Sequence, residues 1–191
     1  MPGIIILSTE RYMDHIKRVG RTLIHHGRIF DYYQDTMLTD EGHTAVWDCI
    51  EHNGAACVIP VREDGKILLV RQFRNPLQIE SLELPAGKRD SKEEPTYACA
   101  VRELEEETGF RSEDIELILP GFITCIAYSS EQIDIYVARN LIPTRQHLDE
   151  DEFIDVEAYS VDELKEMIFN GTIQDSKTVA GILAYAVKYG K

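Results

Sequence analysis

Three glutamates, Glu103, Glu106 and Glu107, stand close together in the segment 94–108, whose residue pattern predicts a helix. At about 100° per residue, their side chains fall within an arc of about 100° on that helix. Like charges at this spacing repel one another, and Arg102 beside Glu106 offsets only part of the surplus. Carboxylate oxygens on one rigid element are ligands that Mg²⁺ and Mn²⁺ prefer. The cluster therefore indicates either a divalent-cation site or a solvated acidic face that aids solubility.

The remainder of this segment predicts how the helix is held in place. The projection puts five side chains on the opposite side, which we expect to pack on a sheet: Tyr97, Val101, Leu104, Glu105 and Thr108. Gly109 follows the helix, at the position where glycine commonly caps a helix end. A strand and a loop that contains glycine precede the helix at 81–92. The glutamates are thus expected on a helix that leaves a strand through this loop.

The order of residues around the glutamates resembles the Nudix box. The family pattern is glycine, five residues, glutamate, seven residues, then Arg-Glu, apolar, any, Glu-Glu, any, Gly, apolar. The matching positions are Gly87, Glu94, Arg102, Glu103, Leu104, Glu106, Glu107, Gly109 and Phe110. Six residues rather than five separate Gly87 from Glu94, and we place the extra residue in the loop because loops tolerate changes of length.

The resemblance implies a divalent-metal site for Mg²⁺ or Mn²⁺. Glu103 and Glu107 match the family's metal ligands, and Glu106 matches a further ligand or a neighbouring group. A main-chain oxygen of the loop also binds metal in the family, and here it would be the carbonyl of Ala86. The resemblance further makes Glu94 and Arg102 the pair that orients the cluster, and Gly87 the turn that brings the loop close to the metal.

The flanking segments resemble the ADP-ribose pyrophosphatase branch over roughly residues 45 to 180. This resemblance implies hydrolysis of the diphosphate bond of ADP-ribose or a related nucleoside diphosphate sugar, which gives a nucleoside monophosphate and a sugar phosphate. Arg71, Arg74 and Glu83 match positions that contact the terminal ribose or the diphosphate. Arginine suits this role because its guanidinium donates paired hydrogen bonds to phosphate oxygens.

The base that activates water is expected from the acidic loop 149–152, where the branch carries its catalytic glutamate. Glu150 and Glu152 are the candidates, with Glu152 ahead, and Glu106 of the box is the alternative. Four consecutive acidic residues also suit a plain solvated loop.

Alternative functions share the same box. The ADP-sugar subgroup usually carries a proline where this chain has Ile126, so a GDP-mannose or other sugar-nucleotide pyrophosphatase is the second hypothesis. A hydrolase of oxidised nucleotides is the third. A non-catalytic ADP-ribose-binding regulator would carry a winged helix beyond the Nudix domain, and the segment after Ser160 is too short for one.

The elements predict an α+β fold, which the resemblance makes an α/β/α sandwich with a mixed sheet between helices. Strands are expected at 54–61, 67–73, 81–85, 115–127, 131–141 and 153–160, and later helices at 161–171 and 177–190. The first two strands flank a hairpin turn at Asp64 and Gly65. Residues 1–50 are expected to form an N-terminal antiparallel β extension, which the resemblance makes a homodimerisation region, and residues 51–191 the Nudix domain.

The composition narrows the class of partner and the compartment. The net charge of −14 disfavours nucleic acid, because such a charge repels a phosphate backbone. No stretch reaches the roughly 18 apolar residues that span a bilayer. The apolar run 4–7 has no basic flank and is not expected to be a secretory signal. Four widely spaced cysteines without a CxxC pair suit a reducing cytoplasm. We therefore expect a cytoplasmic enzyme with a small-molecule substrate.

Overall fold

The computed structural model describes residues 15–191, which form two compact units. One unit extends to His52 and takes in the distant segment Cys125–Ser130. The other unit holds Asn53–Thr124 and Glu131–Lys191. Residues 1–14, which include the start of the predicted extension and the apolar run 4–7, lie outside the described residues.

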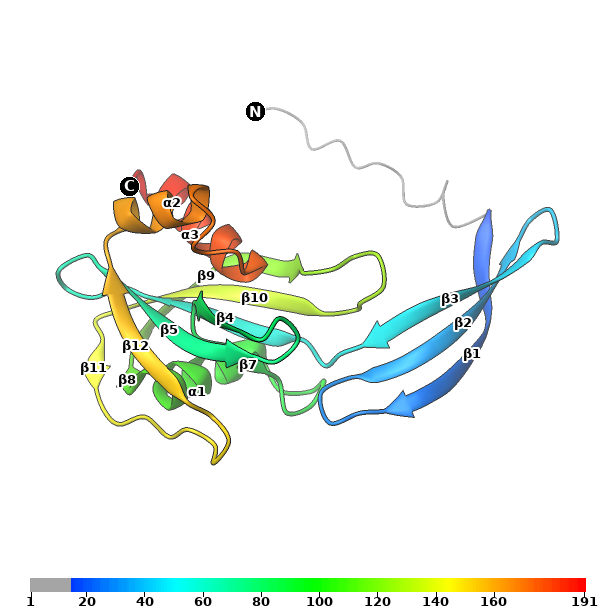
Figure 1. Cartoon of the computed structure of the whole chain (residues 1–191), viewed down its shortest axis with the longest axis horizontal. Helices are drawn as coiled ribbons and strands as arrows, with labels where there is room; N and C mark the ends of the chain where they lie inside the picture. Colours follow the sequence, from blue (N-terminus) through cyan, green and yellow to red (C-terminus); the bar gives the residue numbers. More distant parts are fainter. Residues whose placement is uncertain (1–14) are drawn as a thin grey trace. The chain divides into compact units, whose positions relative to one another are not determined.

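The first unit is a three-stranded antiparallel sheet (Figure 1). Its order is β1(Ile16–His26), β2(Asp31–Thr39), β3(Thr44–Glu51). In residues 15–52, Asp35 is the one buried residue, and Arg21 clamps its carboxylate with hydrogen bonds of 2.7 and 2.9 Å. The predicted antiparallel strands are present, but their own side chains form no apolar core.

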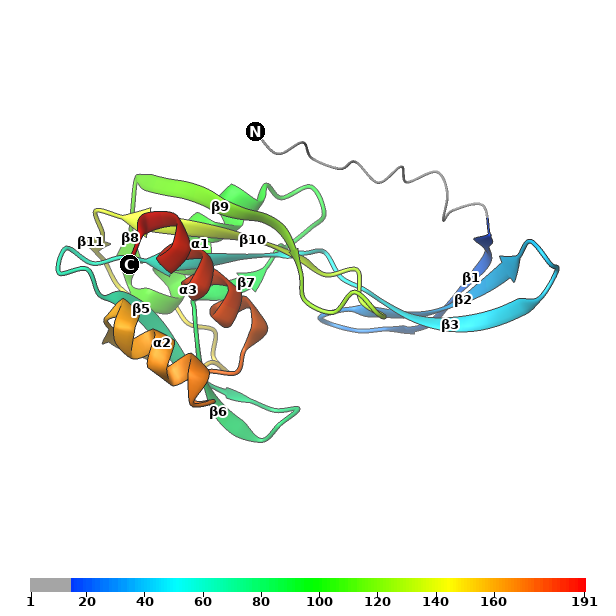
Figure 2. The same cartoon turned by 90° about the horizontal axis from the view of Figure 1, so that it is seen from above.

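The second unit contains two larger sheets and three helices (Figures 1 and 2). A mixed sheet has the order β7(Ala86–Lys88), β4(Ala55–Pro60), β10(Gln132–Arg139), β9(Asp114–Ile123). A second sheet has the order β12(Ile154–Tyr159), β5(Ile67–Arg74), β6(Ile79–Glu83). The short strands β8(Phe110–Arg111) and β11(Ile142–Pro143) pair with each other. The helices are α1(Thr96–Thr108), α2(Val161–Phe169) and α3(Ser176–Tyr189).

Alternate residues of β4 point to opposite helical layers, as the pleat of a strand requires. Ala56 and Val58 pack in a cluster with Leu104 of α1, and Cys57 and Ile59 lie in a second cluster with residues of α2 and α3. The mixed sheet therefore lies between α1 on one face and α2 with α3 on the other (Figure 1). This arrangement confirms the predicted α+β class and the α/β/α sandwich.

The predicted hairpin at Asp64 and Gly65 was only partly right. The turn is present, since the Arg62 N–H donates to the Lys66 carbonyl at 2.9 Å and Gly65 has a φ of 79°. The strands on either side join different sheets, however, and a single bridge between Val61 and Ile67 connects them. The chain turns there from the mixed sheet into the second sheet.

Two further findings concern the whole described chain. The four cysteines are free thiols, and Cys57 and Cys99 are buried. In residues 15–191, every helix is too short or too polar to cross a membrane.

Candidate active site

The glutamate cluster depends on a helix with well-defined ends. Pro95, in extended backbone, precedes α1, and Gly109 ends the helix in the left-handed region at a φ of 70°. The Gly109 N–H donates to the Glu105 carbonyl at 2.9 Å, so the predicted cap is confirmed. The buried residues of α1 are Cys99, Ala100, Glu103, Leu104, Glu107 and Thr108.

The predicted division of α1 into an acidic face and a packing face was wrong. Glu103 and Glu107 are buried on the same side as Leu104, whereas Tyr97 of the expected packing face is 48% exposed. Glu106 is half-buried. The difference arises because β7 lies beside α1 and gives two glutamate side chains an interior surface to contact. Tertiary contact of this kind cannot be seen in a helical projection.

Gly87 explains how Glu103 fits inside. A Cβ atom added to Gly87 would lie 1.9 Å from Glu103 Oε1, far inside contact distance. Gly87 lies in β7 opposite Ala56 rather than in a turn, so the predicted turn role was wrong. The residue is glycine because the Glu103 carboxylate occupies the space of a side chain.

The main chain of Ala86 contacts the second buried glutamate. Its N–H donates to Glu107 Oε2 at 2.9 Å. The side chain of Glu107 therefore lies against the first residue of β7, next to the backbone whose carbonyl the family resemblance implicates in metal binding.

Arg102 joins most of the remaining motif residues. Its Nη1 lies 2.5 Å from Glu103 Oε1 and 2.9 Å from Glu106 Oε2, and its Nη2 donates to the Lys88 carbonyl at 3.1 Å. Its Nε is 3.6 Å from Glu94 Oε1. The structure thus brings the predicted pair Arg102 and Glu94 together beside the cluster.

The pKa values of the two buried carboxyls, Glu103 and Glu107, are raised above their ordinary value. Burial raises the pKa of Glu103 to about 7, although Arg102 opposes the shift. Burial, followed by the charge of Glu103, raises the pKa of Glu107 to about 8. In residues 15–191, no three His, Cys, Asp or Glu side chains converge as a complete ion-binding group. The two carboxylates nevertheless lack enough positive charge to balance them.

The acidic loop lies within electrostatic reach of this cluster. The charge of Glu152 contributes to the raised pKa of both Glu103 and Glu107. Glu152 is exposed, and its carboxylate accepts a hydrogen bond from the Asp149 N–H at 3.1 Å. Glu150 is also exposed. Of the two loop candidates, Glu152 is the one whose charge acts on both buried carboxyls, and its role as the base stays a prediction.

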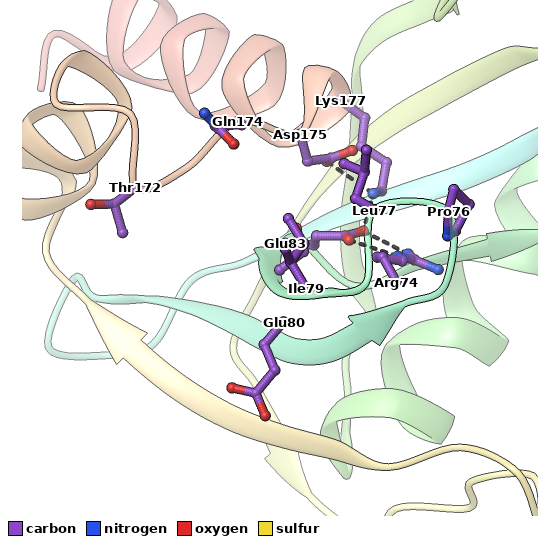
Figure 3. Close-up of a pocket in the computed structure, with 11 residues that line it drawn as sticks. Arg74, Pro76, Leu77, Ile79, Glu80, Glu83, Thr172, Gln174, Asp175 and Lys177 are labelled. Atoms are coloured by element: carbon purple, nitrogen blue, oxygen red, sulfur yellow. Dashed lines mark hydrogen bonds and ion pairs between the residues drawn. The ribbon is translucent and has the colours of Figure 1, made fainter.

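A cavity of about 330 Å³ opens near the ends of β5 and β6 (Figure 3). Its lining comes from the β5–β6 hairpin, the loop before α3 and the first turn of α3: Arg74, Pro76, Leu77, Ile79, Glu80, Ser81, Glu83, Thr172, Gln174, Asp175 and Lys177. Arg74 donates two hydrogen bonds to the buried Glu83, at 2.7 and 2.6 Å. The charge of Glu107 also contributes to a raised pKa of Arg74, so the cluster lies within electrostatic range of the cavity.

Glu83 stays ionised inside the protein. Burial opposes its charge, but the hydrogen bonds from Arg74 and the charge of Lys177 lower its pKa to about 2. Sequence analysis missed Lys177 and Asp175, which lie beside it in the cavity wall. Asp175 could have been found from the sequence, because aspartate is a preferred residue just before the first turn of a helix. In the structure it caps α3, and its carboxylate accepts a hydrogen bond from the Thr178 N–H.

Arg71 lies on the other face of β5, as its odd-numbered spacing from Arg74 requires. Its guanidinium pairs with Glu157 of β12, with Nε 2.5 Å from Oε1. Of the three residues predicted to bind substrate, Arg74 and Glu83 line the cavity, and Arg71 is outside its lining. Substrate contact by Arg71 stays a prediction.

Comparison with known proteins gave one family and several full-length relatives. The NUDIX domain family model matches residues 51–180. The chain is 33% identical over 175 residues to an ADP-ribose pyrophosphatase of Bacillus subtilis (strain 168), covering 91% of each chain. It is 36% identical over 168 residues to a methanol dehydrogenase activator of Bacillus methanolicus, covering 87% of this chain and 90% of the relative. A crystal structure of an ADP compounds hydrolase superposes with a TM-score of 0.79 at 20% identity, covering 92% and 96% of the two chains.

Proposed function

Because the chain belongs to the Nudix family, we propose that it is a metal-dependent pyrophosphatase of ADP-ribose or a related nucleoside diphosphate sugar. Water would add across the diphosphate bond, and the products would be a nucleoside monophosphate and a sugar phosphate. The observation that carries this proposal is the proximity of two kinds of site. Glu103 and Glu107 form a buried carboxyl cluster, and Arg74 presents a cation in the nearby cavity.

The residues present fit a divalent metal ion. Glu103 and Glu107 are buried carboxyls whose pKa values are raised first by burial and further by neighbouring carboxylates, so a cation placed between them would favour their charged forms. Together with the Ala86 carbonyl and Glu106 they offer the hard oxygen ligands that Mg²⁺ or Mn²⁺ prefers. A bound ion of this kind supplies positive charge to the diphosphate oxygens and lowers the pKa of a coordinated water.

The side chains of this protein would then bind the substrate and move the proton. Arg74, held by Glu83, would donate hydrogen bonds to a phosphate oxygen in the cavity. Glu152 would accept the proton of the attacking water, because its loop lies within electrostatic reach of Glu103 and Glu107. Arg102 would keep Glu103 and Glu106 in place through its two ion pairs.

Formation of the nucleoside monophosphate from a panel of nucleoside diphosphate sugars, followed by chromatography, tests this function. We expect ADP-ribose or another ADP-sugar to be hydrolysed fastest with Mg²⁺ or Mn²⁺, and the activity to disappear with EDTA. Faster hydrolysis of GDP-mannose would support the second hypothesis, which uses the same site. One relative is named as an activator of another enzyme, so a binding role without catalysis is the contrasting outcome. Binding of ADP-ribose without any turnover would contradict the proposed hydrolysis.

We further propose that the three-stranded unit forms a homodimer. Five of its apolar side chains are about half exposed: Val19, Leu23, Ile24, Val46 and Trp47. A three-stranded sheet without an apolar core is marginally stable in water, and apolar side chains exposed on its faces favour burial against a partner. A second copy of the chain fits the role that the resemblance gives to residues 1–50.

Light scattering should therefore give about twice 21.8 kDa at micromolar concentration. Replacing Trp47 and Val46 by Ser should shift the mass toward the monomer, whereas the same change at Phe169, which is exposed on α2 of the other unit, should leave the mass unchanged. A monodisperse wild-type monomer would reject this proposal.

The compartment and partner class follow from charge and thiol chemistry. We propose a cytoplasmic location, which the four free cysteines support. Its net charge of −14 favours a small metal-bound substrate over nucleic acid.

A further inference from the structure

Lys177 is a buried lysine that has no role in the proposed reaction described above. Its ammonium lies 2.5 Å from Glu83 Oε2 and 2.9 Å from Asp175 Oδ2 (Figure 3). Glu83 is also the carboxylate that Arg74 grips with two hydrogen bonds. Two cations and two carboxylates thus share one wall of the cavity, and their formal charges sum to zero.

Exposure distinguishes the members of this network. The side chain of Arg74 is 41% exposed, whereas those of Glu83 and Lys177 are 3% and 10% exposed. Arg74 is therefore the cation that a ligand can reach, and Lys177 is the one that stays with the carboxylates. Without Lys177, a single guanidinium would face two carboxylates, and the wall would carry a net charge of −1.

We propose that Lys177 is a positioning residue that balances Glu83 and Asp175, so that Arg74 keeps its positive charge available for the substrate's diphosphate. This inference rests on the proposed function. An anionic ligand is repelled by a wall of net charge −1, and Arg74 would turn more fully toward the uncompensated carboxylates. Lys177 would act through these neighbours, without contact to the reacting atoms.

The start of α3 has a second attachment that does not involve Lys177. The Leu84 N–H donates to Thr178 Oγ1 at 2.8 Å, and the Thr178 hydroxyl donates to Asp175 Oδ2 at 2.6 Å. Asp175 also caps the helix by accepting from the Thr178 N–H at 3.0 Å. A change at Lys177 therefore leaves these anchors in place, which allows its charge to be tested apart from its packing.

The test compares Lys177→Met with the double variant Asp175→Asn/Lys177→Met. Methionine keeps the length of the side chain and removes the charge, so KM for the best substrate of the panel should rise at least about tenfold while kcat stays within about threefold. The double variant restores a net charge of zero, and asparagine can still cap the helix, so KM should return to within about threefold of wild type. Lys188→Met, which removes an exposed lysine on the same helix, is the matched control and should leave KM unchanged.

A purely structural role predicts a different pattern. Both variants would then unfold at lower temperature, and the second substitution would not restore KM. An unchanged KM in Lys177→Met, or a raised KM that Asp175→Asn does not reverse, would overturn the inference. If Lys177→Met does not fold, the single variant Asp175→Asn tests the inference. It gives the cavity wall a net charge of +1, so KM should fall. A rise in KM would contradict the inference. If wild type hydrolyses no compound of the panel, the proposed function fails, and the inference with it.

Discussion

Glu103→Gln and Glu107→Gln should each lower turnover by at least about 100-fold, because each change removes one of the two buried charges that would hold the metal ion. Glutamine keeps the size of the side chain, so the loss would reflect charge rather than a cavity. Steady-state kinetics at saturating Mg²⁺ measure the effect. Glu105→Gln is the control on the same helix, and it should retain wild-type turnover because Glu105 lies outside the buried stripe.

The same two variants should be more stable than wild type when metal is absent. The folded-state pKa values of Glu103 and Glu107, about 7 and about 8, exceed the ordinary value of 4.5 that the unfolded chain would show. Between these values the folded state binds more protons, so the free energy of unfolding falls as pH rises from about 5 to 8. Thermal unfolding in EDTA should show this fall for wild type and a smaller fall for each variant. Near-native turnover in either variant would contradict the assignment of that residue as a metal ligand.

Glu152→Gln should lower turnover by at least about 100-fold, the scale of a lost general base. The affinity for a non-hydrolysable ADP-ribose analogue should stay nearly unchanged, because a base acts in the transition state rather than in ground-state binding. Single-turnover kinetics together with analogue titration separate the two effects. Glu150→Gln is the matched control, two residues away in the same exposed loop, and should be close to wild type.

A different result would move the base to another group. If Glu152→Gln, Glu150→Gln and the double variant all keep wild-type turnover, the acidic loop is only a solvated segment. Glu106 of α1 would then be the remaining candidate, since Arg102 holds its carboxylate beside Glu103.

The sequence predicted the elements more reliably than their contacts. The helix that carries the box and the cap at Gly109 were predictable, because periodicity and capping are local properties. The short strand β7 was not predicted, because three residues carry no periodic signal. Together with β4, that strand covers the side of α1 that carries Glu103 and Glu107, so the predicted orientation of these two glutamates was wrong.

Pairing over long distances limited the prediction of the site. Arg74 and Glu83 were chosen by resemblance, and their ion pair links neighbouring strands. Lys177 is 94 positions from Glu83 and reaches it only because α3 begins beside the end of β6. No local pattern in the sequence marks a lysine for such a contact. The role of Gly87 was likewise visible only once the Glu103 carboxylate was placed against it.

The division of the chain into units has a consequence for its modularity. The segment Cys125–Ser130 is encoded within the residues that match the family, yet it belongs to the three-stranded unit. The Ile50 N–H donates to the Tyr128 carbonyl at 2.7 Å, and the Ser130 N–H donates to the Ile50 carbonyl at 2.9 Å. Removal of residues 1–50 would therefore leave the segment Cys125–Ser130 without these hydrogen-bond partners. The three-stranded unit is thus built from two separate stretches of the chain, and a truncated protein that begins at residue 51 would expose the backbone of 125–130 to solvent.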